Sequence, residues 1–257
     1  MNPRVLPAPT PDVPAIAEAA ACLRSGGLVA FPTETVYGLG ADGLNPTAVA
    51  RIFEAKGRPA TNPLILHVAG VEAARTLASA WPESAQRLAE RFWPGPLTLV
   101  VPADPSVPEI VRAGNPTVAL RCPAHPVALA LVRATGRSLA APSANRSTQL
   151  SPTRAEHVRA GLGDRVDLIL DGGPTTAGLE STIVALDGAV PRLLRPGPLP
   201  PDALEAVVGP LERWRGALAL HERQAAPGMS LRHYAPGTPL VLCPREALVP
   251  REVSPGP

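Results

Sequence analysis

The chain has 257 residues, of which 45% are hydrophobic and 18% charged, so it can bury a full core in one large domain or in one domain with a small appendage. Its net charge of +2 is too mild to predict nucleic-acid binding, which needs a clustered basic face. The cysteines at 22, 122 and 243 lie far apart without a Cys-x-x-Cys pair, which argues against a disulfide framework or a zinc site and fits a reducing cytosol.

The sequence also argues against membrane targeting. The N-terminus leads into a proline-rich stretch without an apolar signal core, and no apolar run is long enough to cross a bilayer. We therefore expect a cytoplasmic protein without a membrane partner.

Apolar periodicity, together with proline and glycine positions, predicts helices that alternate with strands. In chain order we expect a helix at 14–24, a strand at 28–31, a polar loop at 32–45, a helix at 46–55, a strand at 64–68, helices at 71–80 and 83–92, strands at 97–101 and 117–120, a helix at 127–134, a strand at 138–141, a helix at 154–160, a strand at 167–170, a hairpin of 182–186 and 190–194, and a helix at 201–208. This alternation, ending in a hairpin, predicts an α/β domain with a mixed sheet.

The pattern breaks after residue 209. We expect a first domain at 1–209, a linker or lid at 210–239, and at 240–257 the beginning of a second small α/β domain that the remaining residues cannot complete.

Residues 38–43 match the pattern G-x-G-x-x-G, but they are not expected to bind a dinucleotide. That fingerprint sits directly between a strand and a helix, whereas here residues 32–37 separate the expected strand from the first glycine. The sequence also contains no G-x-x-x-x-G-K-[ST] loop, so any nucleotide must bind without a P-loop.

Three polar clusters lie at the ends of predicted strands, where α/β sheets tend to place ligands: residues 32–37 and 142–145 each follow a strand, and residues 56–59 lead into one. Lys56 is the only lysine among 24 basic residues, and Arg58 lies two positions further on. Two cations with nearby hydroxyl and amide groups suit a polyphosphate. Taken singly, a Ser-Ala-Asn segment is also typical of a turn or helix cap, and a lone His67 on a strand is more often packed than catalytic.

No nucleophilic triad or metal-ligand spacing is present. Cys122 is followed by Pro123 and His125, but this spacing matches no nucleophile motif, so we interpret the cysteine as structural. A metal ion would therefore have to arrive with the nucleotide.

Several motifs together resemble the YrdC-like threonylcarbamoyl-AMP synthases. They are LVAFPTETVYGL from residue 28, KGRP from 56 with NPL from 62, and SAN from 143, joined by WPGPLT from 93, TVALR from 117, EST from 180 and LRPG from 194. The resemblance covers roughly residues 26–209. Residues 227–236 are similar to the interdomain linker of longer members, which carry a further small C-terminal domain, whereas this chain ends almost where that domain begins.

The resemblance implies a YrdC-like twisted mixed β-sheet flanked by helices, and an enzyme that makes threonylcarbamoyl-AMP. Such a nucleotidyltransferase joins L-threonine, bicarbonate and ATP, releases pyrophosphate, and serves N6-threonylcarbamoyladenosine modification of tRNA. By this resemblance Lys56 and Arg58 are the catalytic residues and also contact ATP. The remaining implied contacts are Thr35, His67, Arg121 and Ser181 for threonine, and Asn62, Thr117, Ser143, Asn145, Ser151, Arg195 and Tyr234 for ATP.

We expect Mg²⁺ to bridge the ATP phosphates without a dedicated protein site. The product would pass to a tRNA threonylcarbamoyl transferase, with weak or no stable binding of tRNA by this chain. Three alternatives remain: carbamoyl-adenylate synthesis, an RNA-binding module, and a nucleotide-binding paralogue without activity. The absence of Cys-x-x-Cys pairs argues against carbamoyl-adenylate synthesis. The 3% aromatic content argues against RNA binding by base stacking. The intact Lys-x-Arg and Ser-x-Asn sets argue against an inactive paralogue.

Overall fold

The protein was analysed as a computed structural model that describes residues 3–216, 218, 222–229 and 244. Within these residues, the helices are α1 (Pro14–Arg24), α2 (Pro46–Lys56), α3 (Val71–Arg75), α4 (Glu83–Phe92), α5 (Glu109–Arg112), α6 (Pro126–Thr135), α7 (Ala155–Leu162) and α8 (Pro201–Val208). The strands are β1 (Arg4–Pro7), β2 (Val29–Phe31), β3 (Gly38–Asp42), β4 (Ile65–His67), β5 (Leu97–Pro102), β6 (Thr117–Arg121), β7 (Leu139–Ala140), β8 (Leu168–Asp171), β9 (Thr182–Ala185), β10 (Arg192–Arg195) and β11 (Glu212–Arg213).

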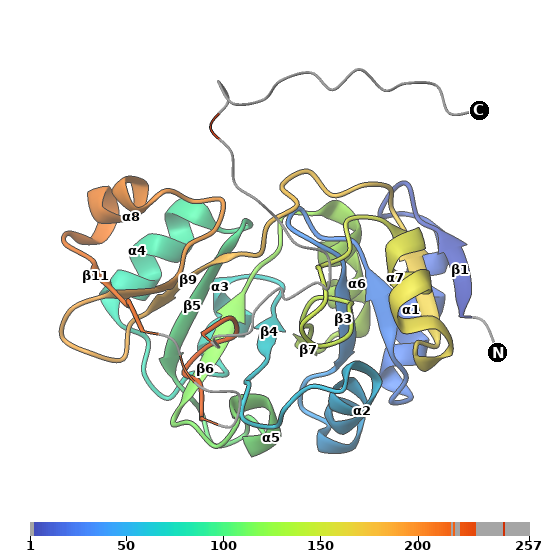
Figure 1. The fold of residues 1–257 in the computed structure, drawn as a ribbon, viewed down its shortest axis with the longest axis horizontal. Helices are drawn as coiled ribbons and strands as arrows, with labels where there is room; N and C mark the ends of the chain where they lie inside the picture. The colour runs from blue at the N-terminus through green and yellow to red at the C-terminus, as the bar shows by residue number, and fades with distance from the viewer. Residues whose placement is uncertain (1–2, 217, 219–221, 230–243, 245–257) are drawn as a thin grey trace.

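The strands form one mixed sheet in the order β1-β8-β2-β3-β7-β4-β6-β5-β9-β10-β11. Parallel pairs such as β4 with β6 lie beside antiparallel pairs such as β5 with β6, and β9 and β10 form the predicted antiparallel hairpin. The expected mixed α/β fold is confirmed. Figure 1 shows α4 and α8 near one end of the sheet and α1, α6 and α7 near the other.

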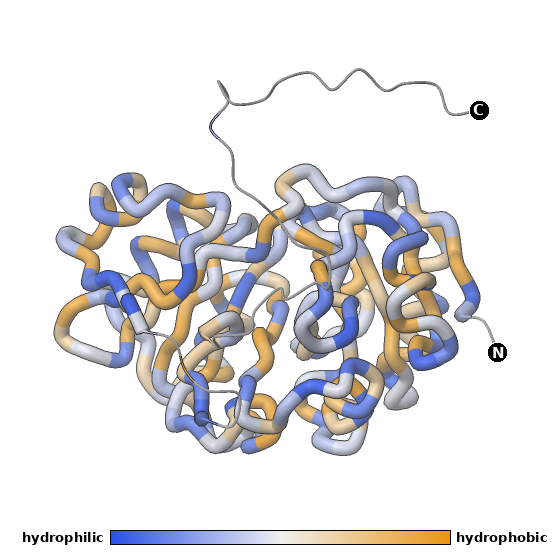
Figure 2. Tube along the Cα trace, viewed as in Figure 1, coloured by the Kyte–Doolittle hydropathy of each residue, from blue (hydrophilic) through white to orange (hydrophobic). Residues whose placement is uncertain are grey.

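Strand alternation divides the core between the two faces of the sheet. Leu66 and Leu120 belong to the largest cluster, where apolar residues from α2, α4, α5, α7 and α8 cover one face. On the opposite face, α1 and α6 cover β2 and β8, whereas residues near Ala226 and Met229 cover Ile65 and Ala119. Figure 2 shows hydrophobic stretches along the central strands. His67 directly follows Leu66, and Arg121 directly follows Leu120, so both point to the opposite face from these leucines. They therefore share the second face of the sheet with Ile65.

The prediction of a loop at 32–45 is wrong over β3, which pairs with β2 and β7. Gly38-Leu39-Gly40-Ala41-Asp42 has poor intrinsic strand propensity, so tertiary packing must decide its conformation. A Cβ atom at Gly40 would lie 2.7 Å from Cε1 of Phe31, so the glycine permits the aromatic ring to cover the strand. The G-x-G-x-x-G match is therefore strand and not a phosphate-binding turn.

The other differences lie in short elements. The strands β1 and β11 and the helix α5 were not predicted. The predicted helix at 71–80 is helical only over Val71–Arg75, because Ser79 donates its backbone N–H to Pro102 and Ala78 forms a bridge with Ala103. Cys22 and Cys122 are free thiols, and Cys243 lies outside the described residues. In the described part of the chain, the longest apolar helices fall short of what a membrane span requires.

Candidate active site

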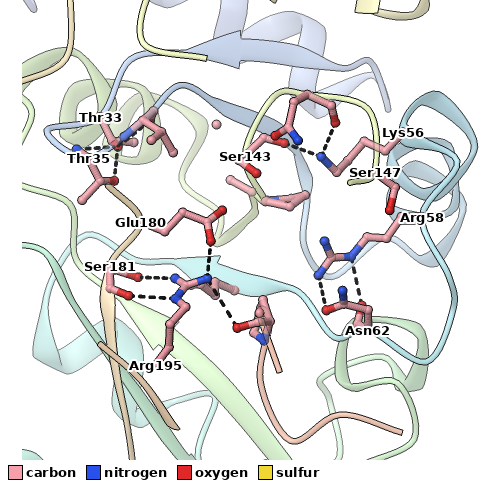
Figure 3. Close-up of a pocket in the computed structure, with 18 of the residues that line it drawn as sticks. Thr33, Thr35, Lys56, Arg58, Asn62, Ser143, Ser147, Glu180, Ser181 and Arg195 are labelled. Atoms are coloured by element: carbon pink, nitrogen blue, oxygen red, sulfur yellow. Dashed lines mark hydrogen bonds and ion pairs between the residues drawn. The ribbon is translucent and has the colours of Figure 1, made fainter. Parts of the chain in front are cut away.

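Among the described residues, a cavity opens on the second face of the sheet, the face that carries His67 and Arg121. Figure 3 shows Lys56, Arg58 and Asn62 on one side of it and Thr35, Glu180, Ser181 and Arg195 on the other. The residues that line this cavity are Thr33, Thr35, Val36, Gly38, Lys56, Arg58, Pro59, Asn62, Ile65, His67, Arg121, Ala141, Pro142, Ser143, Asn145, Ser147, Thr148, Gln149, Glu180, Ser181, Arg195, Pro227 and Gly228.

Helix α2 delivers the cationic side of the pocket. Its first turn is capped by Asn45, whose side chain accepts from two backbone N–H groups, and Pro46 follows at the first helical position. At the other end Gly57 adopts a left-handed conformation (φ 60°), and the backbone bonds from Gly57 to Glu54 and from Arg58 to Phe53 form a Schellman motif. This turn directs Lys56 and Arg58 into the same cavity.

Lys56 ties the helix to the loop that follows β7. Its side chain is 2% exposed, and Nζ donates to the backbone oxygens of Ser143 and Asn145, both at 2.5 Å. In return, the Lys56 backbone oxygen accepts from the N–H of Ser147. Burial, and then repulsion by Arg58, lowers the pKa of the Lys56 ammonium to about 7. A group that titrates so near neutrality can gain a proton when an anion enters.

Arg58 is fixed by the segment that follows it. Its Nε donates to the Asn62 backbone oxygen at 3.0 Å, and Nη2 donates to Asn62 Oδ1 at 2.6 Å and to the Pro63 oxygen at 2.7 Å. Burial lowers the pKa of Arg58 to about 10, so the guanidinium remains a cation at neutral pH. The bonds to Asn62 hold this charge at the cavity wall, where it can meet a phosphate.

Arg121, on β6, supplies a cationic side chain to the other side of the cavity. Its Nη1 donates to Thr35 Oγ1 at 3.0 Å, and its Nε donates to the Gly95 oxygen. Nη2 lies 2.7 Å from Oε1 of Glu34, an ionic contact without the alignment of a hydrogen bond. Both side chains are largely buried, so the Glu34 carboxylate offsets the charge of the guanidinium and fixes its position.

Arg195, on β10, is held by the segment that precedes β9. Nη1 donates to Glu180 Oε2 at 2.6 Å, and Nε and Nη2 donate to the backbone oxygen and the hydroxyl of Ser181. Glu180 also accepts from the Ser151 hydroxyl at 3.4 Å. Its carboxylate is thus surrounded by cationic and hydroxyl groups, in a cavity where Lys56, Arg58, Arg121 and Arg195 outnumber it. The excess positive charge favours anionic ligands.

His67 lies at the floor of the cavity, on β4. The ring is 2% exposed, meets Phe31 edge to face at 6.1 Å, and has no well-aligned hydrogen bond at either nitrogen among the described residues. Burial, and then the charge of Arg121, lowers its pKa to about 3. The imidazole is therefore neutral near pH 7 and can offer one donor and one acceptor to a ligand.

This depressed pKa predicts that His67 destabilises the fold in acid. An unfolded chain takes up a proton on this histidine near pH 6.5, whereas the folded chain does so only near pH 3, so stability falls as the pH drops between these values. Each pH unit in this window changes the free energy of unfolding by about 1.4 kcal/mol. Between pH 6.5 and 5, we expect wild type to lose about 2 kcal/mol more than His67→Gln in urea unfolding.

The control for this prediction is His157→Gln, because His157 is exposed on α7. It should lose stability in acid as wild type does. If His67→Gln follows the same pH dependence as wild type, the imidazole is not held neutral in the folded state.

The structure brings most of the predicted site residues to this one cavity. Those that line it are Lys56, Arg58, Thr35, His67, Arg121, Ser181, Asn62, Ser143, Asn145 and Arg195. Ser151 does not line the cavity, but its hydroxyl donates to Glu180, which does. Thr117 is buried at the start of β6 and does not line it. Tyr234 and residues 240–257, apart from 244, lie outside the described residues.

Sequence reasoning did not assign a role to two carboxylates at the site. Glu34 contacts Arg121, and Glu180 contacts Arg195. Each directly precedes a residue predicted to contact threonine, Thr35 or Ser181, and this position is the sequence signal that could have placed the carboxylate at the site. Their partners lie on distant strands, so the pairing itself could not be read from local spacing.

Comparisons with known proteins show the family of this chain. Residues 21–197 match the family profile of Sua5, YciO and YrdC, which carries the description Telomere recombination. Residues 200–253 match a profile described as Threonylcarbamoyl-AMP synthase, C-terminal domain. The first profile alone covers more than half of the chain.

Individual proteins give the same result. The chain is 51% identical to a threonylcarbamoyl-AMP synthase of Bacillus subtilis over 90% of its own length and 67% of the relative's. It is 51% identical to one of Pyrococcus abyssi, over 87% and 66%. A crystal structure of P. abyssi Sua5 complexed with L-threonine superposes with a TM-score of 0.83 at 51% identity, covering 86% of this chain and 65% of that one. The chain thus spans about two thirds of the length of these relatives.

Proposed function

Since the chain belongs to the Sua5/YciO/YrdC family and is 51% identical to two threonylcarbamoyl-AMP synthases, we propose that it synthesises L-threonylcarbamoyladenylate from L-threonine, bicarbonate and ATP. It would act in the cytoplasm as a nucleotidyltransferase that supplies the N6-threonylcarbamoyl group for tRNA. A tRNA threonylcarbamoyl transferase would take the product, without stable binding of tRNA by this chain.

The observation that carries the proposal is a single cavity with two chemically different sides. Lys56 and Arg58 form a cationic side, next to the loop that contains Ser143 and Asn145. Such a side suits the phosphates of ATP, because cations offset charge and neutral donors fix oxygens. The other side combines hydroxyl groups with Arg121, whose planar fork suits a carboxylate. An amino acid and a nucleotide can therefore meet in one cavity.

The proposed chemistry needs no protein nucleophile. The amine of threonine attacks bicarbonate, a C–N bond forms, water leaves, and a carbamate results. A carbamate oxygen then attacks the α-phosphorus of ATP, and the bond to the pyrophosphate leaving group breaks. Both partners of the second step are anions, so Lys56, Arg58 and Arg195 act by offsetting repulsion and by orienting the attack.

We expect Mg²⁺ to enter with ATP, where it would offset charge on the phosphates. Magnesium prefers oxygen ligands and usually keeps several waters, so a dedicated cage of side chains is unnecessary. The pocket fits such an ion, because Asn145 Oδ1 is buried without a hydrogen-bond partner among the described residues and Glu180 provides a carboxylate in the same cavity.

The domain division at 209 and 239 remains a prediction, in which the linker closes over the reactants and Tyr234 contacts the nucleotide. The described part of the linker supports it, because Pro227 and Gly228 line the cavity. Closure would shield the labile carbamate from water. Loss of activity on truncation before Pro227, in a chain that still folds, is the expected result.

The function itself is tested by measuring pyrophosphate release with ATP, Mg²⁺, bicarbonate and L-threonine, each omitted in turn. Release that needs all of them supports the synthase. Release that needs carbamoyl phosphate in place of threonine would support carbamoyl-adenylate synthesis instead, and tight, salt-sensitive tRNA binding without turnover would support an RNA-binding module.

Proton uptake gives a prediction specific to Lys56. With a pKa of about 7, its amine is mostly neutral at pH 8 in the empty pocket. Bound phosphates favour the ammonium form, so nucleotide binding at pH 8 should take up most of one proton. Titration calorimetry in buffers of different ionisation enthalpy measures this number. Lys56→Met should abolish the uptake, and equal binding enthalpies for wild type in all buffers would contradict it.

A further inference from the structure

Thr98 is a buried hydroxyl residue next to the cavity, and the proposed mechanism gives it no role. It lies on β5, its side chain is 0% exposed, and it does not line the cavity. Its Oγ1 lies 2.7 Å from Oγ of Ser181, which does line it. Ser181 Oγ is therefore placed between a buried threonine and whatever ligand occupies the pocket.

Hydrogen-bond capacity decides which hydroxyl of this pair is the donor. Each hydroxyl group has one proton to donate and two lone pairs to accept with. If Ser181 donated to Thr98, the Thr98 proton would have no acceptor among the described residues, and a buried donor without a partner is costly. Thr98 therefore donates to Ser181.

Arg195 occupies the second lone pair of the same oxygen. Its Nη2 donates to Ser181 Oγ at 3.1 Å, while its Nε donates to the Ser181 backbone oxygen and its Nη1 to Glu180. With a further bond from Nη1 to the Pro227 backbone oxygen at 3.4 Å, the guanidinium is held by four hydrogen bonds. With both lone pairs of Ser181 Oγ in use, its own proton is left to point toward the cavity.

We propose that Thr98 is a positioning residue, which fixes Ser181 as a hydrogen-bond donor toward an oxygen of the bound amino acid or its carbamate. The inference rests on the proposed function for its ligand, because a carboxylate or carbamate oxygen is the acceptor that an amino-acid-dependent adenylate synthesis brings to this place. A ligand with an N–H or O–H group at the same point would meet a donor and bind poorly.

The test compares Thr98→Val, which removes only the donor, with Thr98→Ser, which keeps it. We expect Thr98→Val to raise the Kd of L-threonine in titration calorimetry about fivefold to tenfold, the range of one lost hydrogen bond, and Thr98→Ser to stay within about twofold of wild type. The KM for threonine should rise with the Kd, while kcat changes less. If Thr98→Val does not fold, Thr98→Cys keeps a side chain of similar size with a weaker donor and should give an intermediate Kd.

Two further variants separate positioning from packing. Thr135→Val removes another buried hydroxyl, which bonds within α6 outside the cavity, and should leave threonine binding unchanged. In a Ser181→Ala background, Thr98→Val should weaken threonine binding no further, because its effect passes through Ser181.

The outcomes distinguish this inference from the proposed function. If wild type binds threonine but Thr98→Val behaves like Thr135→Val, or weakens binding equally with and without Ser181, the positioning role is wrong and the proposed function stands. If wild type binds no threonine with or without ATP, both the proposed function and the ligand assigned to Ser181 are overturned.

Discussion

Replacing Lys56 with alanine is expected to lower threonine-dependent pyrophosphate release by about a hundredfold or more, the usual effect of removing a preorganised donor from a reacting centre. Two consequences combine. The anionic reactants lose a compact cation, and the backbone oxygens of Ser143 and Asn145 lose their shared buried donor. The loop after β7 is then no longer tied to the end of α2 from both sides.

Lys56→Arg sharpens this prediction. A guanidinium is larger than an ammonium and planar, so it does not fit the buried space in which the compact Lys56 ammonium reaches both backbone oxygens at 2.5 Å, and charge alone should restore little activity. Arg51→Ala is the matched control, because Arg51 lies on the same helix but forms a partly exposed ion pair with Asp167, outside the cavity. Its activity should equal that of wild type. Activity of Lys56→Ala within about threefold of wild type would contradict the role assigned to Lys56.

Arg121→Met should affect both binding and stability. Loss of the guanidinium removes the group that we propose to bind the threonine carboxylate, and we expect the Kd of threonine to rise about a hundredfold, the upper range for charged hydrogen bonds. It also leaves the buried Glu34 carboxylate without its ionic partner. Breaking a buried pair from one side costs about 3 kcal/mol in the free energy of unfolding.

The double variant Arg121→Met/Glu34→Gln separates the two effects. It removes the unpaired charge, so most of the stability measured by urea unfolding should return while threonine binding stays weak. Arg4→Met, which breaks the exposed pair with Glu18, should cost less than about 1 kcal/mol. Recovery of threonine binding in the double variant would show that Arg121 serves the fold and not the ligand.

The sequence predicts the fold well where apolar periodicity is strong. Strands such as β5 and β6, and helices such as α1 and α4, lie within a few residues of their predicted bounds. It fails at β3, where glycines and Asp42 carry no strand signal and the packing of Phe31 decides. It also fails at β1, which gains its hydrogen bonds from β8, far along the chain.

The same distinction holds for the candidate site. Lys56, Arg58, Asn62 and Ser143 could be proposed from local motifs, and the structure brings all of them to one cavity. The contacts that orient such residues join distant segments, as between Ser181 and Thr98, and depend on the register of neighbouring strands. No local pattern of residue types encodes that register, so those contacts required the folded structure.

The most direct test of the central claim is mass spectrometry of the product formed by the chain from ATP, L-threonine and isotopically labelled bicarbonate in the presence of Mg²⁺. The account predicts an adenylate that carries both the threonine and the labelled carbon, and that disappears when threonine is omitted or when Lys56→Ala replaces wild type. Nucleotide binding without any labelled adenylate, from wild-type protein shown to be folded and to bind threonine, would contradict it.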